Sequence, residues 1–151
     1  MVFSPTSFRA DVGDVLRVDL VVVAGSLSVN NVEMHIDFDP ALLQVVDIGS
    51  SPASEIEANL SELGTELFNE ADNSTGRIRY HAGKLVAPST GTVRVATVRF
   101  KVIEAGPTTV HYASESDVFY RGASVVRGLG SAEVTPTDGH VFVPTGRKDV
   151  R

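Results

Sequence analysis

Apolar and polar residues alternate along most of the chain, and clusters of turn-forming residues interrupt the alternation about every ten residues. This pattern is typical of β-strands with one packed and one solvated face, because successive side chains of a strand point to opposite faces of the sheet. The cleanest case lies between the turns at Gly25-Ser26 and Asp39-Pro40. Its predicted core face consists of Val32, Met34, Ile36 and Phe38, and its predicted outer face of Asn31, Glu33, His35 and Asp37.

Other segments have the same pattern. Residues 15–23 are largely apolar on both faces, which predicts a central strand of its sheet. Residues 77–82 follow a turn that ends at Gly76, and their alternation directs Ile78 and Tyr80 inward and Arg79 and His81 outward. Further strands are predicted at 42–48, 93–103, 108–113, 118–121 and 139–143, with 118–121 either a separate strand or a continuation of 108–113 past an irregular stretch.

The segment 54–63 departs from the strand period. Apolar residues recur there at helical spacing, and Ser54 and Glu57 have the arrangement of a capping box. A short helix is therefore expected, with an irregular crossing between two sheets as the alternative. No internal repeat or low-complexity segment is present, and 151 residues suit one domain. We expect an all-β, jelly-roll-like β-sandwich over 1–144, followed by a polar C-terminal tail over 145–151.

Composition and charge exclude several classes of partner. The chain has 13 basic and 19 acidic residues and a net charge of -6, a balance that repels phosphate backbones, so we expect no nucleic-acid partner. No apolar stretch is long enough to span a bilayer, so no membrane partner is expected. The absence of cysteine rules out disulfides and thiolate metal sites.

Candidate catalytic and metal sites find little support in the sequence. There is no Gly-x-Ser-x-Gly, His-Glu-x-x-His or phosphate-binding glycine motif, and nothing singles out a pair of carboxylates for glycosidase chemistry. His35, His81 and His111 fall on outward strand positions, where isolated surface histidines are the simpler interpretation than a zinc site. The cluster Asp72-Asn73-Ser74 has calcium-ligand residue types but lacks the spacing of a calcium loop, which favours a turn. We therefore predict that the chain is not an enzyme and holds no metal.

The order of these signals resembles that of cohesin domains, and the resemblance covers nearly the whole chain. The matching pieces, in chain order, are Val12-Gly13-Asp14, Ile36-Asp37-Phe38-Asp39-Pro40, Gly76-Arg77-Ile78, Gly91, Val95-Ala96-Thr97-Val98-Arg99-Phe100-Lys101-Val102, Gly106 and Asp138-Gly139-His140-Val141. The chain departs from the simplest members in the length of 54–69 and in the basic character of Arg77, Arg79 and His81.

The resemblance implies a jelly-roll sandwich that binds a dockerin, a small calcium-loaded helical module of another protein, on one exposed sheet face. Asn31 and Glu33 stand where the family presents an Asn and an acidic residue to the partner. Calcium is then expected on the dockerin and no cofactor in this chain. The module is expected to be a monomer when alone and to belong to a larger extracellular or cell-surface protein. The predicted partner-binding residues are Asn31, Glu33, His35, Asp37, Arg79, His81, Lys84, Phe119 and Arg121.

Two other functions share this architecture. A carbohydrate-binding module would need exposed aromatic rings, yet the chain has no Trp, and Tyr80 and Tyr112 alternate toward the core. A structural spacer module would present a sheet face without any partner.

The register of the strand near 118–121 has two interpretations. Continued alternation places Phe119 and Arg121 on the outer face, whereas a bulge near 114–117 would expose Tyr120 instead.

Overall fold

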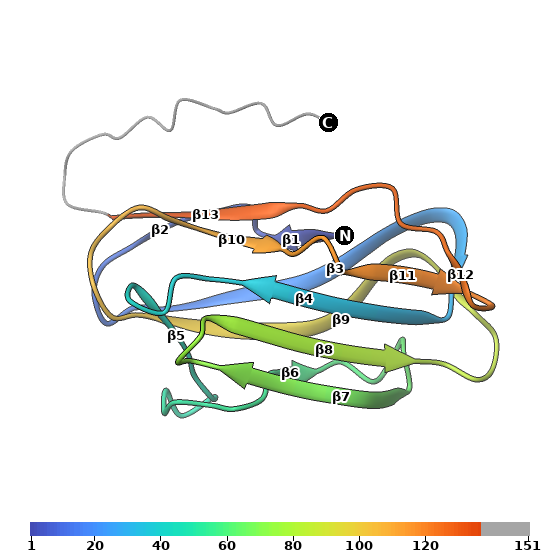
Figure 1. Cartoon of the computed structure of the whole chain (residues 1–151), viewed down its shortest axis with the longest axis horizontal. Helices are drawn as coiled ribbons and strands as arrows, with labels where there is room; N and C mark the ends of the chain where they lie inside the picture. Colours follow the sequence, from blue (N-terminus) through green and yellow to red (C-terminus); the bar gives the residue numbers. More distant parts are fainter. Residues whose placement is uncertain (137–151) are drawn as a thin grey trace.

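The computed structural model describes residues 1–136, which form two β-sheets packed face to face (Figure 1). All regular structure in this range is β, arranged as 13 strands. The predicted all-β sandwich is confirmed. The strand expected at 139–143, the motif at 138–141 and the tail at 145–151 lie outside the described residues. Within them, no helix is long and apolar enough to cross a membrane.

The first sheet is antiparallel and has five strands. Its order is β1-β3-β9-β5, and β6 pairs with β9 beside β5. The bounds are β1 Val2–Ser4, β3 Val15–Val29, β5 Leu43–Val45, β6 Glu57–Ala58 and β9 Ser89–Val102. The long pair of β3 and β9 forms the centre of this sheet.

The second sheet has eight strands, with β4 at its centre. On one side β4 pairs with β8, which pairs with β7 at the edge; on the other side it pairs with β10 and β11 (Figure 1). β13 then pairs with β10 and, in parallel, with β2. The bounds are β2 Ser7–Ala10, β4 Asn31–Asp37, β7 Thr65–Asp72, β8 Arg77–Gly83, β10 Thr108–Tyr112, β11 Asp117–Tyr120, β12 Ala123–Ser124 and β13 Ser131–Pro136.

The core lies between the facing apolar rows of the two sheets. Val32, Met34 and Ile36 of β4 are completely buried, as the alternation predicted. Aromatic rings join the layers, because Phe38 meets Phe100 edge-on with the ring centroids 5.3 Å apart. Burying these apolar side chains is the main favourable contribution to folding, at about 1.5–3 kcal/mol for each large side chain.

Tyr112 ties β10 to the opposite sheet. Its ring stacks on Phe3 of β1 with the centroids 4.3 Å apart, and its hydroxyl donates a hydrogen bond to the Val2 carbonyl. Burial raises the pKa of Tyr112 and also raises that of Tyr80, which reaches about 12. Both tyrosines face the core, as predicted, and neither offers its ring to a ligand on the surface.

The helix expected at 54–63 is wrong. The segment instead contains β6, whose residue Glu57 pairs with Thr97 of β9. The Asn69 side chain bonds both the amide and the carbonyl of Ile56, which fixes this stretch in an extended form. Leu60 is 49% exposed, so the spacing did not mark one buried helical face. Tertiary pairing overrode local propensity here, and the alternative of an irregular crossing is the closer description.

The central strand predicted at 15–23 is confirmed as part of β3, between β1 and β9. Its second apolar face is only partly covered, however, because Val15 and Val23 are 39% and 63% exposed whereas Val21 is buried. One face of a sheet in a two-layer sandwich remains open to solvent, even at a central strand.

Candidate partner-binding face

The outer face of the second sheet is centred on β4, and its geometry follows from strand register. Glu33 pairs with His81 of β8 on one side and with Asp117 of β11 on the other. Asp37 lies between Arg77 of β8 and His111 of β10. Because directly paired residues project to the same face of a sheet, the outward side chains of these strands form one continuous surface. The predicted outer row of β4 is thereby confirmed as outward.

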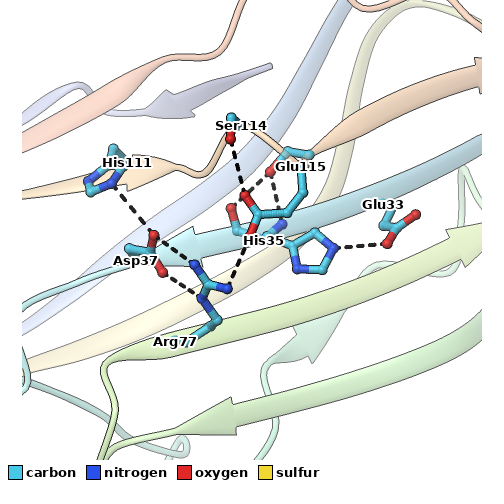
Figure 2. Close-up of polar contacts among 8 residues, drawn as sticks. Glu33, His35, Asp37, Arg77, His111, Ser114 and Glu115 are labelled. Atoms are coloured by element: carbon cyan, nitrogen blue, oxygen red, sulfur yellow. Dashed lines mark hydrogen bonds and ion pairs between the residues drawn. The ribbon is translucent and has the colours of Figure 1, made fainter.

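An ionic network occupies one end of this face (Figure 2). The Arg77 guanidinium donates two hydrogen bonds to Asp37, at 2.7 and 3.1 Å, and one to Glu115 at 3.0 Å. His111 Nε2 lies 3.7 Å from the same Asp37 carboxylate. The hydrogen bonds from Arg77 hold the pKa of Asp37 below its usual value, and Asp37 in turn raises the pKa of Arg77. Charges at this end are therefore already paired.

His35 is fixed from two directions. Its Nε2 lies 2.9 Å from Glu33 Oε1, so the neighbouring outward residues of β4 are bonded to each other (Figure 2). Its backbone amide and carbonyl both bond the hydroxyl of Ser116, a residue in the break between β10 and β11. The Ser116 side chain thus completes the β4 ladder where neither of those strands pairs with it.

The break between β10 and β11 resolves the register of Phe119. His111 pairs with Asp37 and Phe119 pairs with Asn31, so β11 is displaced by two residues relative to β10. A displacement by an even number keeps the alternation. Phe119 therefore lies on the outer face, as predicted, and 118–121 corresponds to a separate strand, β11.

Arg121 lies just beyond β11 rather than on the strand. Tyr120 pairs with Ala123, which leaves Arg121 and Gly122 as a two-residue turn with φ values of 50° and 79°. Positive φ at both central residues is the conformation of a type I′ hairpin turn. The Arg121 guanidinium lies 5.2 Å from the centroid of the Tyr120 ring. Because Tyr120 alternates to the face opposite Phe119, Arg121 lies in the turn beyond the strand with its guanidinium directed away from the outer face.

The remaining predicted residues lie on or beside β8. His81 Nε2 is 2.7 Å from Asn31 Oδ1, and Arg79 donates to Glu70 of β7 at 2.6 Å. Lys84 follows the end of β8, and its amide donates to the Asn30 carbonyl. The structure therefore brings eight of the nine predicted residues to one face or its rim, and Arg121 lies in the turn beyond it.

The three candidate histidines face different groups: His35 lies at hydrogen-bond distance from Glu33 and His81 from Asn31, and His111 lies 3.7 Å from Asp37. In the part of the chain that the structure describes, no group of three or more His, Asp or Glu side chains is arranged to hold a metal ion. At the candidate calcium cluster, hydrogen bonds from Ser74 and Thr75 lower the pKa of Asp72 to about 2. The predicted turn is confirmed there, since two hydrogen bonds from Ser74 and one from Thr75 to Asp72 close it locally.

Sequence reasoning missed apolar residues at the other end of the face. A β-bulge in β7 between Glu66 and Phe68 inserts Leu67, and these two apolar residues remain 55% and 44% exposed. Leu85, in the loop after β8, is fully exposed. The adjacent apolar pair Leu67-Phe68 breaks the alternation of this strand, and that break was the available signal for a bulge.

Leu67 and Leu85 border a shallow hollow of about 480 Å³, and the Phe68 ring beside it meets the Arg79 guanidinium, 5.0 Å from the ring centroid. Its lining combines predicted and missed residues: Asn30, Asn31, Glu33, Thr65, Leu67, His81, Gly83, Lys84, Leu85, Phe119 and Gly122. The face is thus polar and charge-paired at the Asp37 end and apolar and hollowed at the Leu67 end.

Comparison with known proteins points to one family. The model of the cohesin domain family matches residues 1–143. No curated protein matches the chain.

Three solved structures illustrate the similarity in fold. The type II cohesin dyad from the adaptor ScaA scaffoldin of Acetivibrio cellulolyticus has a TM-score of 0.70 and 16% identity, covering 88% of this chain, which spans 46% of that structure. CaCohA2 from Clostridium acetobutylicum has a TM-score of 0.72 and 15% identity, covering 92% of each chain. The third cohesin ScaC of Acetivibrio cellulolyticus, in complex with the ScaB dockerin, has a TM-score of 0.64 and 17% identity, covering 86% of this chain and 92% of that one.

Proposed function

The chain belongs to the cohesin domain family, and from this premise we propose that it is a non-catalytic adhesion module that binds a calcium-loaded dockerin. A structurally similar cohesin, ScaC, is seen in complex with a dockerin. The calcium would reside in the dockerin, whose folded helices depend on it, and none is assigned to this chain. An extracellular or cell-surface location of the parent protein follows from the same proposal.

We assign the dockerin to the outer face of β4 and its neighbours. The observation that carries the assignment is the outward row Asn31, Glu33, His35 and Asp37, which lies between β8 on one side and β10 and β11 on the other. Phe119 and Arg79 adjoin this row, and aromatic and Arg side chains supply much of the energy at protein interfaces. Pairing among the charges holds the polar side chains in place before the partner arrives, which lowers the entropic cost of binding.

A carbohydrate-binding function receives less support. Stacking on sugar rings needs exposed aromatic planes, yet the chain has no Trp, and Tyr80 and Tyr112 are buried. Purified protein should therefore remain in solution when mixed with microcrystalline cellulose.

Charge reversal at Glu33 tests the assigned face. The Glu33 side chain is 43% exposed, so Glu33→Arg should fold normally while weakening a dockerin complex at least about tenfold, or about 1.4 kcal/mol. A panel of calcium-loaded dockerins would be titrated by calorimetry to find a binding pair, and the variant compared on that pair. Glu104→Arg, an identical charge change in the exposed loop after β9, is the matched control. Equal affinity of Glu33→Arg and wild type would show that the dockerin binds elsewhere.

A further inference from the structure

We propose that the apolar end of the face selects one kind of partner side-chain pair: an aliphatic residue on a helix with a carboxylate three or four positions away. The inference rests on the proposed dockerin function and adds the chemistry that this chain would recognise. It is carried by the hollow beside β7 and by the charge at its rim.

The β7 bulge creates the apolar surface. Phe68 pairs with outward-pointing His81, so Phe68 also lies on the outer face. The inserted Leu67 lines the same hollow as His81, which places both apolar side chains on one side of the sheet. Regular alternation would have directed one of two adjacent residues inward. The bulge therefore presents two large apolar groups where an unbroken strand would present one.

The hollow has an open floor at Gly83. A Cβ at this position would lie 3.8 Å from Leu67 Cδ1 and 3.5 Å from the Asn30 carbonyl oxygen, so a larger side chain would occupy the space that Leu67 and Asn31 border. Leu85 and Phe119 form further parts of the wall. An aliphatic side chain inserted here would contact apolar groups from β7, β11 and the loop after β8, which is the environment of an interface anchor.

The charge at the rim is positive and available. Lys84 lines the hollow, and its ammonium group has no ion pair within the described residues. The nearby Glu33 carboxylate is bonded to His35, and Arg79 is bonded to Glu70. Lys84 is therefore the charge at the hollow that a partner carboxylate can neutralise.

The apolar hollow and the Lys84 ammonium group at its rim together define the side chains that a partner must supply. Residues three or four apart on a helix lie about 5–6 Å from each other on one side, so one helix can insert an aliphatic side chain and bring a carboxylate to Lys84. Helices supply the exposed surface of a dockerin under the proposed function, and the hollow is continuous with the polar row of β4 through Asn31 and Glu33.

Selection from a displayed library tests the proposal. A dockerin displayed on yeast, with the exposed positions of its helices randomised, would be selected in calcium for binding to the wild-type domain. We expect Leu, Ile, Val or Met at one position and Asp or Glu three or four positions away. Against these clones Leu85→Ser and Lys84→Glu should each weaken binding about tenfold. Leu85 is 100% exposed, so its replacement removes no core packing.

Matched measurements separate this inference from the function on which it rests. Lys101→Glu on the first sheet carries the same charge change as Lys84→Glu and should bind like wild type. A second selection on Lys84→Glu should replace the acidic residue with Lys or Arg. If Glu33→Arg abolishes binding while Leu85→Ser and Lys84→Glu leave it intact, the dockerin function stands and the anchor is refuted. If no clone binds the wild-type domain, the proposed function fails, and the anchor fails with it.

Discussion

Asn73 illustrates how a single turn residue stabilises the end of this sandwich. Its Oδ1 accepts the Val45 amide at 2.7 Å, and its Nδ2 donates to the carbonyls of Val45 and Ala53 at 3.0 and 3.2 Å. Val45 belongs to β5, so the side chain substitutes for a neighbouring strand in satisfying its backbone. The sequence predicted this turn but not the hydrogen bonds from Asn73 to the backbone of Val45 and Ala53. These bonds join segments distant in sequence, and local patterns contain no information about such contacts.

Replacing Asn73 should therefore destabilise the fold. Asn73→Ala leaves the Val45 amide and the Ala53 carbonyl without this partner, while the Val45 carbonyl keeps its bond from the Ala53 amide, at an expected cost of about 2–3 kcal/mol. Urea unfolding measures the change in the free energy of unfolding. Ser74→Ala in the same turn is the control and should cost less than about 1 kcal/mol, because Ser74 bonds only Asp72 and is exposed. Equal costs for the two variants would contradict the role assigned to Asn73.

The Asp37–Arg77 pair should make stability depend on pH in a defined direction. Because Arg77 holds the pKa of Asp37 below its value of 3.8 in the unfolded chain, the pair stabilises the fold above that pH and loses its contribution as the pH falls through the lower folded value. The Tm of Arg77→Gln should thus lie below that of wild type at pH 7, with the gap narrowing below about pH 4. Both side chains are partly exposed, so the effect at pH 7 should stay near or below about 1 kcal/mol.

An NMR titration of the Asp37 carboxyl group provides the direct measurement. Its pKa should move up toward 3.8 in Arg77→Gln. A gap in Tm that widens on acidification, or an Asp37 pKa that does not change, would show that the pair contributes in some other way.

At the scale of the element, glycine positions with positive φ differ in how strictly they require glycine. Gly76 precedes β8 with φ of 71°, and a Cβ there would lie 2.1 Å from the Phe38 carbonyl oxygen. Gly91 in β9 has a similar φ of 76° but no atom within 4 Å of such a Cβ. Both positions favour glycine because their φ is positive. Gly76 is also confined by the backbone of Phe38, the residue that follows β4.

The two glycines therefore form a matched pair for mutation. Gly91→Ala should cost about 1–2 kcal/mol, from the left-handed conformation alone. Gly76→Ala should cost about 2 kcal/mol more, because the backbone at Phe38 must shift to admit the methyl group. Thermal unfolding of both variants measures the difference. Equal destabilisation would mean that the contact with Phe38 relaxes freely.

Elements with unbroken alternation were the ones that sequence reasoning could predict. β4 was predicted with both of its faces, and with it the polar row at the centre of the candidate site. β7 was missed because the bulge at Leu67 breaks the alternation, and the apolar end of the face was missed with it. β6 was missed because its pairing with β9 is set by contacts distant in sequence. Periodicity therefore predicted the regular half of the face, whereas the irregular half depended on long-range pairing.

At the scale of the whole molecule, the apolar core stabilises the sandwich, whereas bound calcium would stabilise the proposed dockerin partner. The described residues contain no group of three or more metal-ligating side chains, and two packed sheets bury the apolar rows without one. A ligand that binds only the folded state raises stability according to its free concentration and affinity. Because we expect calcium on the dockerin and not in this chain, adding or chelating the ion should leave the Tm of the isolated domain unchanged.

The complex should respond to chelation in the opposite way. A dockerin stripped of calcium would lose the folded helices that contact the outer face around β4, so chelator should dissociate the complex, and added calcium should restore it. Calorimetry of the complex and thermal unfolding of the isolated domain, each with and without chelator, measure the two effects separately. A complex that persists in chelator would show that the partner is not a calcium-dependent dockerin. A fall in the Tm of the isolated domain would instead place a metal site within this chain.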